Sequence, residues 1–201
     1  MAAFDSAHKG APPLDHLPYA PNAGARSESA RAGSSLVRHG SVTAALVADT
    51  HLPRGSRQLS EKCLGALHAA DIILHGGDVT TAAALATLEE LGRIHAVFGN
   101  ADEPALRTSL PERLVLNVGR ARIGLVHDAG PRLGRHARLL TWFPECDVIA
   151  YGHTHAAELE RVGDTWVVNP GSPTERRRAA ARTMARVVVD DGIAIELLKL
   201  P

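Results

Sequence analysis

Five short apolar runs in this 201-residue chain each lead directly into polar residues of the same few types. The residues that follow the runs are, in chain order, Asp49-Thr50-His51, Gly77-Asp78, Gly99-Asn100, His127 and Gly152-His153-Thr154-His155. Short apolar runs bounded by glycine and polar turn residues predict buried strands. In open α/β sheets, ligands bind beyond the carboxyl ends of the strands. The pattern therefore predicts one composite site at one edge of the fold.

The remaining apolar periodicity predicts how the chain alternates between strands and helices. We expect strands over 42–49, 71–78, 93–100 and 147–153, helices over 59–70, 80–92 and 132–143, and paired strands over 113–128, 158–172 and 185–200. Helices alternate with strands first and hairpins dominate later. This order predicts an α/β protein with one mixed sheet or two packed sheets.

Composition divides the chain into two parts. Residues 1–40 are rich in Pro, Gly, Ser and Ala and poor in large apolar residues, which predicts a disordered N-terminal extension. Residues 41–201 have the length and apolar content of one domain. We see neither a secretory signal pattern nor a membrane-length apolar run, so we expect a cytoplasmic protein that does not bind membranes. The two cysteines, Cys63 and Cys146, lack metal-site spacing and are expected to be reduced.

The charge balance limits the possible partners. The 22 Lys and Arg residues equal the 22 Asp and Glu residues, and aromatic residues make up only 3% of the chain. Long nucleic acids need a basic surface, and single strands are usually held by stacked aromatic side chains. A nuclease acting on long nucleic acid is therefore disfavoured, and a small anionic substrate would require a local positive centre.

The residue types after the apolar runs are typical ligands of divalent metal ions. They comprise two Asp, one Asn and four His, and His153 and His155 point to the same side if the segment is extended. Seven ligands exceed the needs of one tetrahedral ion and suit two ions about 3.5–4 Å apart that share a carboxylate. The isolated histidines His68, His95 and His136 are expected to be structural. His75 is also expected to be structural, with support of a metal ligand as the alternative.

The order Asp-x-His, Gly-Asp, Gly-Asn, His and Gly-His-x-His resembles the calcineurin-like metallophosphoesterase superfamily. The compact length, "GNAD" at 99–102 and "VVNPGSPTERR" at 167–177 are similar to its small YfcE/Vps29-like phosphodiesterase branch. The resemblance covers residues 41–200. It implies the metallophosphoesterase fold, a four-layer α-β-β-α sandwich of two mixed β-sheets. It also implies a metal-dependent phosphodiesterase that hydrolyses small phosphodiesters.

The resemblance further implies a role for each motif residue. One ion would be held by Asp49, His51 and His155, the other by Asn100, His127 and His153, with Asp78 as the bridge. Manganese is the expected metal, with iron, zinc, nickel and magnesium as alternatives. A metal-bridging hydroxide would attack phosphorus, which makes Asp78, Asn100 and His127 the predicted catalytic residues. Asn100 would turn its NH₂ group to the substrate, and Gly152 would let the backbone turn sharply beside the two histidines.

The sequence departs from the superfamily pattern at three places. Ala101 stands where many members have a histidine that protonates the leaving group, so this task is unassigned. Asp128 follows His127 where the branch commonly has glycine, and an extra carboxylate there would bind water or disturb the site. A run of Glu175 and three arginines replaces a usual Pro-Arg pair. We interpret this run as a solvated basic loop, with contact to an anionic substrate as the alternative; Arg54 is the better candidate for phosphate binding.

A function from a different class uses the same fold. A non-catalytic interaction module of the Vps29 kind would keep the sandwich and act through surface contacts. All seven ligand positions carry an expected residue type, which favours catalysis. A metallo-β-lactamase-like hydrolase would require a His-x-His-x-Asp-His motif, which the sequence lacks. The sequence leaves the oligomeric state open.

Overall fold

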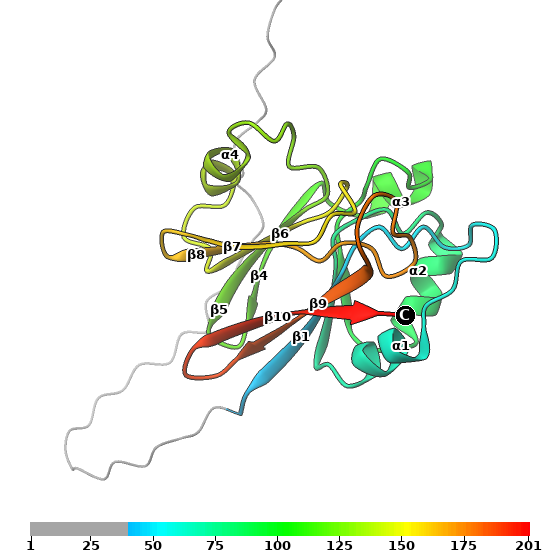
Figure 1. Cartoon of the computed structure of the whole chain (residues 1–201), viewed down its shortest axis with the longest axis horizontal. Helices are drawn as coiled ribbons and strands as arrows, with labels where there is room; N and C mark the ends of the chain where they lie inside the picture. Colours follow the sequence, from blue (N-terminus) through cyan, green and yellow to red (C-terminus); the bar gives the residue numbers. More distant parts are fainter. Residues whose placement is uncertain (1–39) are drawn as a thin grey trace, which may run out of the picture. The chain divides into compact units, whose positions relative to one another are not determined.

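The computed structural model describes residues 40–201. The predicted extension over 1–40 lies outside the described residues except for Gly40, so it stays a prediction. In the described range, the strands form two five-stranded sheets (Figure 1). No helix in residues 40–201 has the length and apolarity that crossing a membrane requires.

The first sheet carries the motifs of the first half of the chain. Its strand order is β10-β9-β1-β2-β3. The strands are β1 (Val42–Val47), β2 (Ile72–His75), β3 (Ile94–Ala96), β9 (Arg182–Val189) and β10 (Ile193–Leu200). Strands β1, β2 and β3 are parallel, whereas β9 pairs antiparallel with both β1 and β10. The sheet is therefore mixed, and three motif-bearing strands end on the same side.

The second sheet has the order β4-β5-β6-β8-β7. Its strands are β4 (Arg113–Val118), β5 (Ala121–Val126), β6 (Val148–Tyr151), β7 (Glu158–Val162) and β8 (Thr165–Asn169). Strands β5, β6 and β8 are parallel, and β4 and β7 are antiparallel edge strands. The paired strands predicted over 158–172 correspond to β7 and β8, which are joined by a tight turn at Gly163-Asp164.

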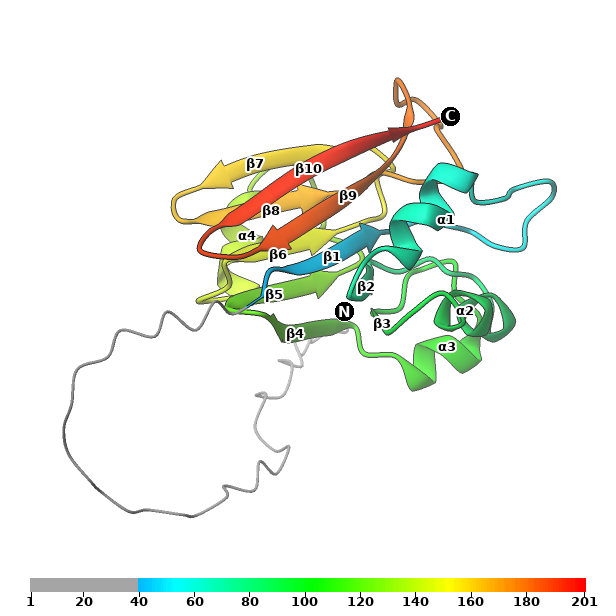
Figure 2. The ribbon, with the colours of Figure 1, turned by 90° about the horizontal axis from the view of Figure 1, so that it is seen from below.

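Three apolar clusters hold four layers together. The central cluster joins the inner faces of the two sheets and includes Leu46, Leu74, Ile123 and Val148. A second cluster packs the first sheet against helices α1 (Glu61–His68), α2 (Ala82–Glu89) and α3 (Pro104–Ser109). A third packs the second sheet against α4 (Arg135–Trp142). The helices cover opposite outer faces (Figures 1 and 2), which confirms the predicted α-β-β-α sandwich.

Local capping explains where two helices begin. The backbone N–H of Cys63 donates to Ser60 Oγ over 3.3 Å, and that of Ala84 donates to Thr81 Oγ1 over 3.2 Å. These bonds satisfy amides that have no partner within the helix. The residue that caps α2 is thus Thr81 and not the neighbouring Thr80. Helix α3 was not predicted, although Pro104 at its first turn is a recognised start signal.

Candidate metal centre

The seven predicted ligands meet at the carboxyl ends of strands from both sheets. Asp49, Asp78 and Asn100 follow β1, β2 and β3, whereas His127 follows β5, and His153 and His155 follow β6. Contacts of 2.8–3.9 Å link them in a continuous series from His155 to His153. Residues more than a hundred positions apart in the sequence therefore form one centre.

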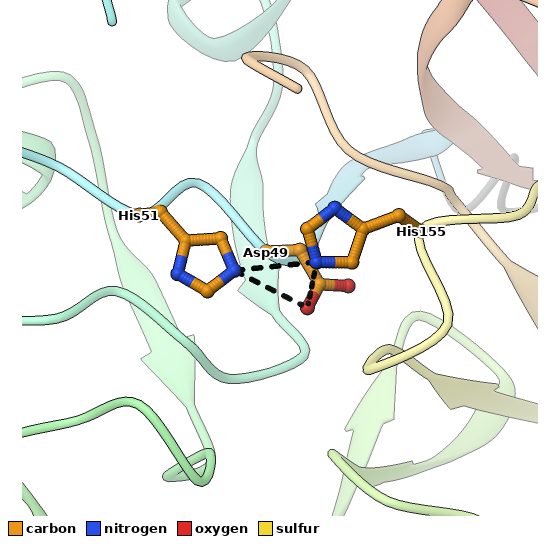
Figure 3. Close-up of side chains that lie close together, drawn as sticks. All are labelled: Asp49, His51 and His155. Atoms are coloured by element: carbon orange, nitrogen blue, oxygen red, sulfur yellow. Dashed lines mark hydrogen bonds and ion pairs between the residues drawn. The ribbon is translucent and has the colours of Figure 1, made fainter. Parts of the chain in front are cut away.

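Asp49, His51 and His155 form a buried group at one end of this series (Figure 3). His155 Nε2 lies 3.2 Å from Asp49 Oδ1 and 3.2 Å from His51 Nε2. His51 Nε2 is 3.9 Å from the same carboxylate oxygen. Two imidazole nitrogens and a carboxylate oxygen thus converge on one point. Burial lowers the pKa of His51, although the charges of Asp78 and Asp49 act in the opposite direction, so this imidazole tends to be neutral, the form that binds metals.

Asp78 lies between this group and the next. Its Oδ2 atom is 3.5 Å from His51 Nε2 and 3.4 Å from His127 Nε2, and its Oδ1 accepts a 2.7 Å hydrogen bond from the Ala101 N–H. Burial alone would raise the pKa of Asp78, but the hydrogen bonds and positive potential of His127 and the Ala101 amide lower it to about 2. The carboxylate is therefore ionised and faces both groups.

His127 and His153 approach the side-chain oxygen of Asn100 at the solvent-facing end. His127 Nε2 is 3.1 Å and His153 Nδ1 is 2.8 Å from Asn100 Oδ1. His127 Nδ1 donates to the Gly76 carbonyl over 2.8 Å, because a carbonyl can only accept. In its neutral form, His127 therefore directs the lone pair of Nε2 at two oxygens. A metal ion between the Nε2 lone pair and these oxygens would remove their repulsion. Without a metal ion, a proton on Nε2 would remove it.

Asp49 provides the clearest test of whether these residues fit a metal ion. Both of its carboxylate oxygens are fully buried and accept no hydrogen bond from the described part of the chain. A buried carboxylate without hydrogen-bond donors is unfavourable unless a cation compensates it. Two sets of possible ligands, Asp49-His51-His155 and Asp49-Asp78-His127, each place their ligand atoms within 4.8 Å of one another. The donor set therefore fits divalent metal binding.

Backbone strain is concentrated in the same residues. Asp49, His51, Asp78, His153 and His155 have φ angles of 55°, 46°, 60°, 68° and 58°. Non-glycine residues rarely adopt this left-handed region, and each instance costs on the order of 1 kcal/mol or more. The predicted turn beside the two histidines thus lies at His153 and His155, not at Gly152. Gly152 is needed for close packing instead, because a Cβ there would lie 2.9 Å from the Gly76 carbonyl oxygen.

His75 supports the loop between Asp49 and His51 from within the core. The Gly77 N–H donates to His75 Nδ1 over 3.1 Å, so the ring proton is on Nε2 and donates to Thr50 Oγ1 over 3.0 Å. Complete burial lowers the pKa of His75 to about 3, which keeps the ring neutral. The structural role of His75 is thus to hold Thr50, the residue between the candidate ligands Asp49 and His51.

Residues 169–174, at the end of β8 and directly after it, hold the same loops from the other side, and the sequence analysis missed this role. Ser172 Oγ donates to the Asp49 carbonyl over 2.7 Å, and Thr174 Oγ1 donates to the Thr50 carbonyl over 2.8 Å. Asn169 Nδ2 donates to the Gly152 carbonyl over 2.9 Å and to Thr154 Oγ1 over 3.0 Å. The motif "NPGSPT" was noticed only for its family resemblance. Its hydroxyl and amide groups replace hydrogen bonds that strained loops cannot make themselves.

Some predicted residues are not brought into the centre. Arg54 is exposed, and its side chain makes no hydrogen bond or ion pair with residues 40–201, so its contact with substrate stays a prediction. Asp128 is exposed and accepts a 2.7 Å bond from the Gly130 N–H in its own loop. The unpredicted Arg57 pairs with Glu175 over 2.8 Å, and Glu175 Oε2 is 3.8 Å from His155 Nδ1. Glu175 is thus the nearest carboxylate to the far side of that ring.

The structure thus defines an α/β protein with two mixed sheets and a cluster of Asp, Asn and His residues at strand ends that fits divalent metal binding. A family model for the calcineurin-like phosphoesterase superfamily domain matches residues 42–192, and the chain belongs to this superfamily. A probable metallophosphoesterase of Methanocaldococcus jannaschii is 30% identical over 166 residues, which cover 80% of this chain and 83% of the relative.

Solved structures share the fold. Vacuolar protein sorting 29 (Vps29) of Cryptosporidium parvum aligns with a TM-score of 0.69 at 20% identity, covering 80% of this chain and 92% of the other. A predicted phosphoesterase of Streptococcus pneumoniae aligns with a TM-score of 0.59 at 24% identity, covering 80% and 90%. These likenesses concern the fold alone. They show that this chain shares its fold with both kinds of protein.

Proposed function

We propose that the protein is a dinuclear, divalent-metal-dependent phosphodiesterase acting on small diesters in the cytoplasm. The observation that carries the proposal is the buried Asp49 carboxylate, which has no hydrogen-bond partner among residues 40–201 but faces His51 and His155. Asp78, which faces both histidine groups, is the natural shared ligand. Manganese is the metal we expect, with iron, zinc, nickel and magnesium as alternatives.

The side chains of the centre divide the work of binding and orientation. Asp49, His51 and His155 would hold one ion and Asn100, His127 and His153 the other, with Asp78 between them. Two bound divalent ions would activate water and polarise the phosphoryl oxygens. The Gly76 carbonyl fixes the ring of His127, and the Ala101 amide fixes Asp78. Asn100 is exposed, so its NH₂ group is free to donate to a phosphoryl oxygen while its Oδ1 serves as a ligand.

No protein nucleophile is required for this reaction. The centre is formed from carboxylate, amide and imidazole groups, and the described cysteines are buried away from it in apolar clusters. Burial raises the pKa of the Cys63 thiol to about 12, which further excludes it as a nucleophile. Water is thus the attacking group, in line with the leaving alcohol.

A metal panel on the purified full-length protein tests the proposal. The protein is stripped with EDTA, reloaded separately with Mn²⁺, Fe²⁺, Zn²⁺, Ni²⁺ or Mg²⁺, and assayed with bis(p-nitrophenyl) phosphate and p-nitrophenyl phosphate. We expect the highest turnover with Mn²⁺ and on the diester, with Asp49→Asn inactive and the surface control Asp164→Asn unchanged. Turnover no higher than that of Asp49→Asn with every metal would contradict the proposal.

The Vps29-like alternative makes the opposite prediction in the same assay. Its support is the fold shared with the Vps29 structure, because a likeness at 20% identity shows a fold and not an activity. A protein that binds two ions by elemental analysis but hydrolyses neither ester would favour an interaction module. The ion pairs and buried donors of the centre would then serve folding rather than hydrolysis.

A further inference from the structure

We propose that a cavity beside the metal centre binds a second phosphate of the substrate, distinct from the phosphate that is hydrolysed. The cavity has a volume of about 350 Å³ and is lined by Thr154, Ala156, Arg177, Arg178 and Ala179. The proposal rests on the proposed phosphodiesterase function and specifies its substrate class. It adopts the alternative interpretation of this basic segment, contact with an anionic substrate, in place of a solvated loop.

The cavity and the candidate metal centre share one wall. Thr154 lies between His153 and His155 in the chain, so the loop that carries two candidate ligands also lines the cavity. Asn169 holds this loop through Thr154 Oγ1 and the Gly152 carbonyl. Thr154 therefore borders both the loop that carries the candidate ligands and the cavity that the two arginines line.

The charges around the cavity favour an anion. Glu175 is the acidic residue of this loop, and it is paired with Arg57 over 2.8 Å and with Arg177 over 3.7 Å. The Arg178 side chain is exposed and makes no ion pair with the described residues. One carboxylate is thus shared by two arginines, and Arg178 adds a further uncompensated charge. Guanidinium groups bind phosphate through paired N–H donors, and these charge-assisted bonds are roughly twice as strong as neutral ones.

The scissile phosphate is not the expected occupant. That group needs the metal ligands, none of which lines the cavity. The volume is sufficient for a phosphate with part of the sugar that bears it. We therefore assign the cavity to a phosphomonoester on the alcohol that stays bonded to phosphorus, not on the leaving group. Nucleotide esters that carry a second phosphate are of this kind.

A matched pair of substrates tests the assignment. Thymidine 5′-(p-nitrophenyl phosphate) and its 3′-phosphorylated analogue have the same scissile group and leaving group and differ only in the second phosphate. We expect the kcat/KM of the wild-type enzyme to be about tenfold higher for the phosphorylated compound. The double variant R177Q/R178Q should lose this preference while keeping its turnover of the unphosphorylated ester. Arg176→Gln, an exposed arginine of the same loop outside the cavity lining, should keep the preference.

Calorimetry without metal separates this proposal from the proposed function. Thymidine 3′-phosphate should bind the EDTA-treated wild-type protein, and R177Q/R178Q should weaken the affinity about tenfold relative to R176Q. If neither ester is hydrolysed but this difference in binding is found, the subsite stands and the phosphodiesterase assignment falls. Binding that is equal in all three proteins overturns the subsite. So does an equal loss of activity on both esters, because the arginines would then contact the scissile phosphate.

Discussion

The Nε2 atoms of His51 and His155 lie 3.2 Å apart, with the two rings stacked at a centroid distance of 5.1 Å. Asp49 Oδ1 completes the group. Two neutral imidazoles cannot both direct lone pairs at this point without repulsion, unless a proton or a cation lies between them. These nitrogens belong to loops after β1 and β6, which are strands of different sheets. The stability of the contact between the two sheets at this end therefore depends on whether a proton or a cation is bound.

Metal binding should therefore stabilise the fold. At a free Mn²⁺ concentration of a hundred times the Kd, linkage adds about 2.7 kcal/mol to the free energy of unfolding. We expect a rise in the Tm of EDTA-treated protein on adding Mn²⁺, measured by calorimetry. His155→Gln should remove most of this rise, whereas the exposed His68→Gln should retain it. A His155→Gln protein that responds to Mn²⁺ like the wild type would show that this group is not a ligand.

Asp78→Asn should impair both ions, because its Oδ2 faces His51 and His127 at 3.5 and 3.4 Å. Metal ions supply several kcal/mol of transition-state stabilisation, so we expect kcat to fall by about a hundredfold or more. Elemental analysis should show lower occupancy than in His153→Ala, which removes a ligand of one ion only. Retention of two ions and near-normal turnover would show that Asp78 does not bridge.

Gly99→Ala should disrupt the centre without touching a ligand. A Cβ at this position would lie 2.1 Å from Asp78 Oδ1 and 2.4 Å from the Asp78 backbone nitrogen, so the loop must move. Overpacking of this kind costs about 1–3 kcal/mol. Urea denaturation should show this loss together with weaker metal binding. The control Gly65→Ala, in α1 with open space around it, should instead stabilise by about 0.5–1 kcal/mol.

The buried His75 should make stability depend on pH. Its pKa is about 3 in the folded state against 6.5 when unfolded, so protonation favours the unfolded chain. The contribution is fully present above pH 6.5 and is lost as the pH falls towards 3, which amounts to about 2 kcal/mol at pH 5. Urea denaturation in EDTA at pH 7 and 5 measures it. His75→Gln should lose about 2 kcal/mol less over this interval, and an identical pH dependence in both proteins would refute the assignment.

Because position 101 is an alanine, the rate of hydrolysis should depend on the pKa of the leaving group. General acid catalysis is worth about two to four orders of magnitude, and no imidazole stands here to provide it. Asp102 is a poor substitute, because its two carboxylate oxygens accept the N–H groups of Thr80 and Gly99 over 2.6 and 2.7 Å. We expect a steep fall in rate across diesters of rising leaving-group pKa, and Ala101→His should flatten it. A flat series in the wild type would show that another residue donates the proton.

The sequence predicted what depends on local pattern. Apolar runs followed by Asp, Asn and His located five strand ends, and the parallel arrangement of these strands explains why the ligands meet. The supporting bonds could not be read in this way, because Ser172 and Thr174 contact carbonyls 123 and 124 residues earlier in the chain. The left-handed conformations of His153 and His155 were also missed, because tertiary contacts impose them against local preference. Helix α3 was not predicted because six residues are too few to show a helical period.

Five of the predicted ligands adopt a strained left-handed conformation, so the residues that fit metal binding also destabilise the folded chain. Glycine would relieve the strain at Asp49, His51, Asp78, His153 and His155, so replacements that abolish metal binding remove an energetic burden from the apoprotein. Under relaxed selection, such changes would be stabilising steps rather than damage. Loss of these candidate ligands should therefore leave a stable apoprotein that keeps the fold but has no metal centre.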